Sequence, residues 1–146
     1  MLALLYSLDG QHVVLMKRTR PLWQAGRVNA LGGGIIEGEA PASAARREVR
    51  EECGVDVEEW TEMLVWEDAE YRMHVMRAMS ARASEARTIE DQEVFLASVN
   101  ALPANVIDNL RWLVPLALDR DVATPIEVRS AAVEGSGLTE RDRERE

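Results

Sequence analysis

The chain has 146 residues, of which 47% are hydrophobic and 29% charged, and this composition is typical of a globular domain of ordinary size. Its formal net charge of −9 disfavours nonspecific binding to polymeric nucleic acid or to an anionic membrane, and no apolar run is long enough to span a bilayer. The single cysteine, Cys53, excludes an internal disulfide, and the opening segment lacks a basic region, so we expect a cytoplasmic protein without a signal peptide.

The first predicted elements are a β-hairpin and a helix. Two apolar, β-rich runs, LALLYSL and HVVLMKR, are separated by Asp9 and Gly10, which is a strong hairpin pattern. The stretch TRPLWQAGRVNALGGG is expected to be a loop or a short strand. A helix is then expected from Pro41 to about Cys53, because proline is favoured at the first helical position and Gly54 stands just past the end.

The rest of the chain predicts further strands and a second helix. Strands are expected within residues 55–66, 71–81 and 93–99. A helix is expected over residues 102–118, bent or ended by Pro115, with an apolar stripe formed by Ile107, Leu110, Val114 and Leu118. Strands and helices therefore interleave, which indicates an α+β or mixed α/β fold class. We expect one domain over residues 1–123 and a polar tail over 124–146 that is disordered in part.

The first predicted helix carries like charges close together. Carboxylates three and four residues apart on a helix repel one another, so the cluster needs a compensating charge. A solvated acidic face with an arginine partner is one interpretation. Binding of Mg²⁺ is the other, because Mg²⁺ takes oxygen ligands and the preceding glycines would let the backbone approach and offer a carbonyl. The residues concerned are Glu48, Glu51 and Glu52, with Arg47 beside them and Gly32, Gly33 and Gly34 ahead of the helix.

The spacing of these residues follows a known pattern, G-x5-E-x7-R-E-U-x-E-E-x-G-U, where U is a bulky aliphatic residue. Every position is matched, by Gly33, Glu39, Arg47, Glu48, Val49, Glu51, Glu52, Gly54 and Val55. The chain therefore resembles the Nudix hydrolases, and weaker likeness over most of its length is to a bacterial and phage MutT-like subgroup. The resemblance implies an α/β/α sandwich around a mixed β-sheet.

The resemblance also assigns roles within the signature. Glu48, Glu51 and Glu52 would bind the catalytic Mg²⁺, with Mn²⁺ as the alternative metal, and the Gly32 carbonyl would be an additional ligand. Arg47 would orient these carboxylates. Residues with structural roles in the motif would be Gly33, Gly54 and Glu39, the last bracing the loop against the helix.

A general base is not identified by the signature, since relatives use either a signature glutamate or an acid from a later loop. The stretch TIEDQEVF supplies Glu90, Asp91 and Glu93, of which Glu93 is favoured because it leads directly into a predicted strand. A surface carboxylate without a role and a fourth metal ligand are the alternatives for Glu93.

Residues outside the signature are candidates for binding substrate. Arg18 and Arg20 could hold distal phosphates, and Asn29 could read a base edge. Trp23 and Tyr71 could stack on a base or bond to it. A place in the core or on the solvated surface is the alternative for each of them.

The resemblance implies hydrolysis of a nucleoside diphosphate derivative. The favoured substrate is a nucleoside triphosphate, or an oxidised one such as 8-oxo-dGTP, cleaved to the monophosphate and pyrophosphate. Glu70 stands where ADP-ribose hydrolases of the family usually carry a proline, whereas Tyr71 fits dinucleoside polyphosphate hydrolases. These two activities and a noncatalytic nucleotide-binding regulator remain alternatives. Homodimers are common in the family, so a homodimer is a further expectation.

Overall fold

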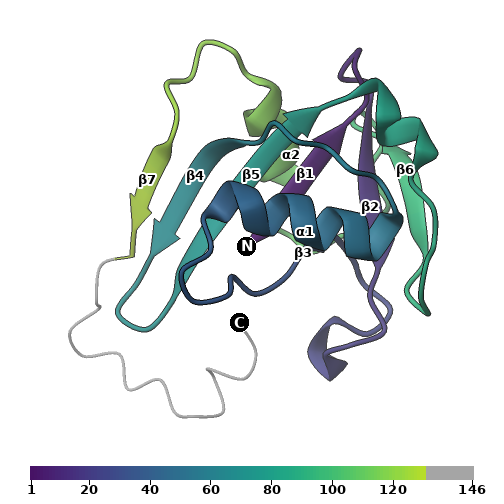
Figure 1. Ribbon diagram of the computed structural model, residues 1–146, viewed down its shortest axis with the longest axis horizontal. Coiled ribbons are helices and arrows are strands. Elements are labelled where there is room, and N and C mark those ends of the chain that lie inside the picture. The colour runs from purple at the N-terminus through teal and green to yellow at the C-terminus, as the bar shows by residue number, and fades with distance from the viewer. Residues whose placement is uncertain (131–146) are drawn as a thin grey trace.

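The computed structural model describes residues 1–130, so most of the predicted polar tail lies outside the described residues. A seven-stranded mixed sheet separates two layers, with α1 on one face and α2 on the other (Figure 1). This arrangement confirms the predicted α/β/α sandwich. The strands are β1 (Leu2–Tyr6), β2 (His12–Lys17), β3 (Val28–Gly32), β4 (Thr61–Glu67), β5 (Arg72–Met79), β6 (Val94–Ser98) and β7 (Ile126–Arg129). The helices are α1 (Pro41–Cys53) and α2 (Leu110–Leu118), with short 3₁₀ helices η1 (Leu22–Gln24) and η2 (Ala81–Glu85).

The sheet has the strand order β6-β2-β3-β1-β5-β4-β7. β1 pairs in parallel with β5 and β4 with β7, and the other pairs are antiparallel. The central β1 is buried along its whole length, and its alternate residues face opposite layers. Leu4 and Tyr6 pack in the cluster that contains α2, whereas Ala3 and Leu5 pack in the cluster that contains α1.

The second helix is shorter than the sequence predicts. It begins at Leu110 rather than near residue 102, because backbone groups of the preceding segment bind the start of β3 instead of forming helical bonds. Val28 N donates to Asn105 O at 3.0 Å, and Ile107 N donates to Val28 O at 2.8 Å. Pro115 does not end the helix, which continues to Leu118. Its buried residues are Leu110, Leu113, Val114 and Ala117, and Leu118 packs partly buried against the same cluster, whereas Ile107 precedes the helix and is not part of its stripe.

Strand β7 was not predicted. It pairs in parallel with β4, and its Ile126 and Val128 pack against the core cluster on the α2 side. The sheet therefore continues past residue 123, where the sequence placed the end of the domain. Among residues 1–130, no helix has the length and apolarity that a transmembrane span requires.

Tyr6 joins the sheet to α2. Its side chain is fully buried and its hydroxyl donates to Val114 O at 2.8 Å. Burial raises the pKa of this phenol well above its usual value, so the hydroxyl keeps its proton and remains a donor. A neutral hydrogen bond of this kind contributes about 1 kcal/mol to stability.

We predict that Tyr6→Phe lowers the free energy of unfolding by about 1 kcal/mol, since the Val114 carbonyl loses a donor while the ring still fills its place. Urea unfolding monitored by circular dichroism measures the change. Tyr71→Phe is the matched control, because that side chain is exposed and should leave the stability unchanged. Equal stability of Tyr6→Phe and the wild type would show that the bond contributes nothing.

Candidate active site

Helix α1 has the bounds that the sequence predicts, and local signals explain both ends. Pro41 occupies the first turn, and the Gly54 C-cap is left-handed, with φ of 76°. Ala45, Val49 and Cys53 pack in the core cluster beneath the helix. Because Ala45 and Cys53 have small side chains, α1 packs close to the sheet. The polar face of α1 therefore lies beside the end of β3, where Glu52 binds Gly32 N–H.

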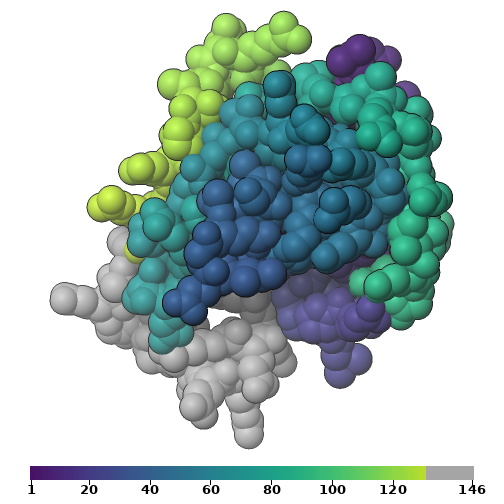
Figure 2. Space-filling model, viewed as in Figure 1, coloured from purple at the N-terminus to yellow at the C-terminus, as the bar shows by residue number. Residues whose placement is uncertain are grey.

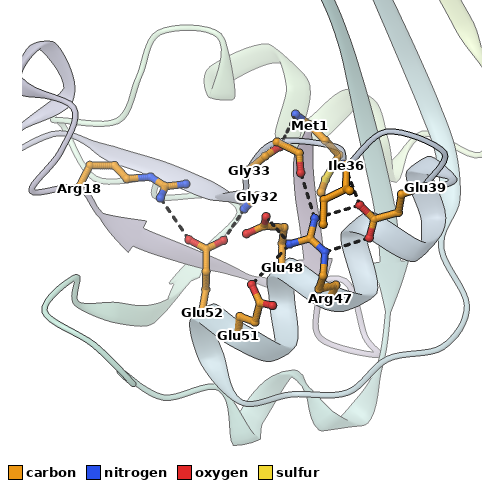
Figure 3. A network of polar contacts seen from close by, with 11 residues as sticks. Met1, Arg18, Gly32, Gly33, Ile36, Glu39, Arg47, Glu48, Glu51 and Glu52 are labelled. Carbon is orange, nitrogen blue, oxygen red and sulfur yellow. Dashed lines mark hydrogen bonds and ion pairs between the residues drawn. The ribbon is translucent and has the colours of Figure 1, made fainter.

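Arg47 joins the helix to the loop that follows β3 (Figure 3). Its guanidinium forms two bonds to Glu39, from Nε to Oε1 at 2.9 Å and from Nη2 to Oε2 at 3.0 Å. Nη2 also donates to Gly34 O at 3.0 Å, and Nη1 donates to Glu48 Oε1 at 2.7 Å. The hydrogen bond to Arg47 lowers the pKa of Glu39 from its usual value. The loop and Glu48 are thereby fixed by one side chain.

Glu52 lies one helical turn beyond Glu48 and faces the end of β3. Its Oε1 accepts from Gly32 N at 2.7 Å, and its Oε2 accepts from Arg18 Nη1 at 3.1 Å. The Glu52 side chain is 14% exposed and that of Glu48 is 16% exposed. Burial raises the pKa of Glu52, with a smaller contribution from the charge of Glu48. The site therefore favours an added positive charge.

The glycines ahead of α1 make room for this arrangement. A Cβ atom on Gly33 would lie 2.6 Å from the Glu48 carboxyl carbon, so the carboxylate occupies the space that a side chain would fill. Gly32 has φ of +139°, and a Cβ there would lie 2.2 Å from Met1 O. In contrast, a Cβ on Gly34 would meet nothing within 4 Å. Glycine at position 33 therefore leaves room for the Glu48 carboxylate, whereas glycine at position 32 leaves room for the backbone of Met1.

The donor set fits a hard divalent cation, since it consists of carboxylate oxygens, with the backbone of Gly32 beside Glu52. Among residues 1–130, no three His, Cys, Asp or Glu side chains converge tightly enough to hold a metal ion as they stand. The carboxylates are instead turned to their arginines and, for Glu52, to Gly32 N–H, while Glu51 is largely exposed and only 3.5 Å from Arg47. Rotation of these side chains would be needed to bring their oxygens onto one ion.

The predicted substrate residues lie in different settings. Arg20 is exposed and pairs with Asp91 at 2.8 Å and with Glu90 at 3.5 Å. Trp23, on η1, and Tyr71, in the β4–β5 turn, are 52% and 55% exposed and available for stacking. η1 belongs to the violet segment that protrudes below α1 in Figure 2.

Asn29 is not open to a ligand. It is buried, its Nδ2 donates to Gln24 Oε1 at 3.1 Å, and its Oδ1 accepts from Ala30 N at 2.8 Å. Asn29 therefore connects β3 to η1. Because its amide groups are already bonded within the protein, it could affect base recognition only by positioning η1.

Glu93 and its neighbour Gln92 stand beside the Arg18 loop. The Glu93 side chain is exposed, and its backbone carbonyl accepts from Lys17 N at 2.8 Å. Gln92 is buried, and its Oε1 accepts from Thr19 N at 3.2 Å. Sequence reasoning missed Gln92 and Gln24 as positioning residues, since a lone glutamine in a loop carries no pattern that identifies its partner.

Comparisons with known proteins agree with this geometry. A family model for the NUDIX domain matches residues 1–124. A structure of MutT, from work on MutT of the fish pathogen Aliivibrio salmonicida and of Vibrio cholerae, is similar with 19% identity and a TM-score of 0.62, covering 80% of this chain and 92% of its own. MutT NUDIX hydrolase from Burkholderia pseudomallei is similar with 24% identity and a TM-score of 0.61, covering 79% of this chain and 96% of its own. A search of curated proteins finds no match.

The chain therefore belongs to the Nudix family and is a Nudix pyrophosphohydrolase. Enzymes of this family act on nucleoside diphosphate derivatives and generally use divalent metals.

We predict that Gly33→Ala lowers the rate of nucleotide hydrolysis by about tenfold or more, because the new methyl group displaces the Glu48 carboxylate from its place beside the loop. The loss of stability should be small, since a carboxylate at the end of a flexible side chain can move aside. Steady-state hydrolysis and thermal unfolding measure the two effects. Gly34→Ala is the matched control and should keep wild-type activity, as its added Cβ meets nothing. Full activity of Gly33→Ala would contradict this account of the site.

Proposed function

We propose that the chain hydrolyses (deoxy)nucleoside triphosphates, including oxidised ones such as 8-oxo-dGTP, to the monophosphate and pyrophosphate with Mg²⁺. The observation that carries the proposal is the pair of mostly buried carboxylates, Glu48 and Glu52, held beside a glycine backbone. Two mostly buried like charges one turn apart repel, and a bound divalent cation would offset that repulsion. An acidic protein binds an anionic nucleotide with the help of divalent cations or of a local basic patch, and the carboxylates favour the first.

The residues that would hold the cation are Glu48, Glu51, Glu52 and the Gly32 carbonyl. When bound, Mg²⁺ supplies neutralising charge for the diphosphate and a lowered pKa for the attacking water. Arg47 orients Glu48 and, through Glu39, fixes the loop that the substrate phosphates would approach. Gly32 N–H holds one oxygen of Glu52, and the other oxygen accepts from Arg18. Most of the rate would then come from positioning and electrostatics, as in phosphoryl transfer generally.

Glu93 is the proposed general base. Its side chain is exposed and has no hydrogen bond or ion pair with any other described residue, so it is free to accept a proton from water. Glu93 lies just before β6, and its backbone carbonyl accepts a hydrogen bond from Lys17 N at the end of β2. A signature glutamate is the other candidate for this role.

Trp23 is the proposed stacking platform for the base, because it presents an exposed ring on η1. The contact of Asn29 with Gln24 holds η1 against β3 and would set the position of that ring. Arg20 would assist by attracting phosphates to the same loop.

A substrate panel tests the proposed function. Pyrophosphate and phosphate release with Mg²⁺ would be measured for each NTP and dNTP, 8-oxo-dGTP, ADP-ribose and diadenosine polyphosphates. We expect a preference for one nucleoside triphosphate. A preference for ADP-ribose or a dinucleoside polyphosphate would replace the proposed substrate, and nucleotide binding without hydrolysis would indicate a regulator.

We predict that Glu52→Gln lowers kcat by about 100-fold or more, since it removes a charge that the cation requires. The helix should remain folded, because the glutamine oxygen can still accept from Gly32 N–H and the change relieves repulsion with Glu48, while the Tm falls because Arg18 loses its ionic partner; circular dichroism would check the fold. Glu59→Gln, an exposed carboxylate near α1 in sequence, is the matched control and should keep the wild-type kcat. A fully active Glu52→Gln would remove this residue from the metal site.

We also predict that Mg²⁺ raises the Tm of the wild type. A ligand that binds only the folded state at 100 times its Kd stabilises it by about 2.7 kcal/mol. Differential scanning fluorimetry across a Mg²⁺ titration measures the shift, with Glu52→Gln expected to show a smaller one. An equal shift in both proteins would place the metal elsewhere.

A further inference from the structure

Arg18 differs from the other arginine at the carboxylate cluster. Arg47 is shared between Glu39, Glu48 and Glu51, so its charge is divided over several carboxylates. Within residues 1–130, Arg18 pairs with a single carboxylate, that of Glu52. The charge of Arg18 therefore neutralises the Glu52 carboxylate alone.

The position of Arg18 is rigid. Its backbone N–H donates to Arg27 O at 2.8 Å, and its carbonyl accepts from Gly26 N at 2.8 Å. The guanidinium is fixed a second time by the bond from Nη2 to Ala30 O at 2.9 Å. Hydrogen bonds at both backbone and side chain therefore hold the Arg18 guanidinium beside Glu52.

Burial of the Arg18 guanidinium beside Glu52 is in part energetically unfavourable. The Arg18 side chain is 13% exposed, and its Nε is buried without a hydrogen-bond partner among the described residues. An unsatisfied buried N–H is unfavourable, so attraction to Glu52 and the bond to Ala30 O must offset it. The sequence predicted Arg18 as a ligand of distal phosphates, whereas the structure turns its guanidinium to the carboxylate.

We infer that Arg18 is the counter-cation of Glu52 in the metal-free protein and competes with the divalent metal for that carboxylate. The inference rests on the proposed metal site. Arg18 Nη1 binds Oε2, the oxygen that Gly32 N–H leaves free, so metal and guanidinium approach the same oxygen. Two cations on one carboxylate repel, and metal binding must therefore displace or weaken the ion pair.

Direct Mn²⁺ binding without nucleotide tests this competition. Isothermal titration calorimetry would give the Kd for the wild type and for Arg18→Gln, which keeps polar bulk but removes the charge. We expect Arg18→Gln to bind Mn²⁺ about tenfold more tightly, and its metal-free Tm to fall because Glu52 loses its partner. Arg46→Gln is the matched control: it removes an arginine of α1 that pairs with Asp56 and Glu58 rather than with the carboxylate cluster, and its Kd should equal that of the wild type.

The possible outcomes separate the inference from the proposed function. Equal or weaker Mn²⁺ binding by Arg18→Gln, with normal binding by the wild type, would overturn the competition alone. Absence of Mn²⁺ binding in both proteins would overturn the metal site and the competition together. If Arg18→Gln does not fold, Arg18→Lys provides the second test, since the shorter single-point cation cannot contact Ala30 O and Glu52 in the same geometry. About threefold tighter Mn²⁺ binding is expected for that variant, and an unchanged Kd would contradict competition.

Discussion

The repulsion between Glu48 and Glu52 is the constraint on which the rest of the site depends. These carboxylates stand one turn apart on α1, and both are mostly withdrawn from solvent. Two such charges persist together only with compensation: Glu52 is bound by Arg18, and Glu48 by Arg47, which also binds Glu39. Charges gathered in this way attract a divalent cation and, through it, an anionic nucleotide.

The fold supplies the rigidity that this arrangement needs. α1 packs on the sheet through small side chains, and the end of β3 lies directly beside the polar face of the helix. The glycine at position 33 lets the loop pass over the Glu48 carboxylate, while Arg47 and Glu39 tie that loop down. Helix, strand and loop therefore position the carboxylates together, so displacement of one element would disturb the whole site.

The sequence predicted the parts of the structure that depend on local signals. The bounds of α1 followed from Pro41 and Gly54, and the fixed spacing of the signature identified the cluster. The start of α2 was missed because residues 105–107 bind Val28, a contact distant in sequence that overrides local helical preference. The four-residue β7 was missed because its pairing with β4 gives no local pattern, and the partner of Arg18 lies 34 residues away.

We propose that the carboxylates of α1 and the backbone at Gly32 form the metal site. Anomalous diffraction from a crystal soaked with Mn²⁺ would locate the ion without reference to activity. We expect a peak within coordination distance of Glu52 and of at least one other signature carboxylate, with the Arg18–Glu52 contact lengthened. A peak only at other residues, or none at saturating Mn²⁺, would show that these groups do not bind the metal.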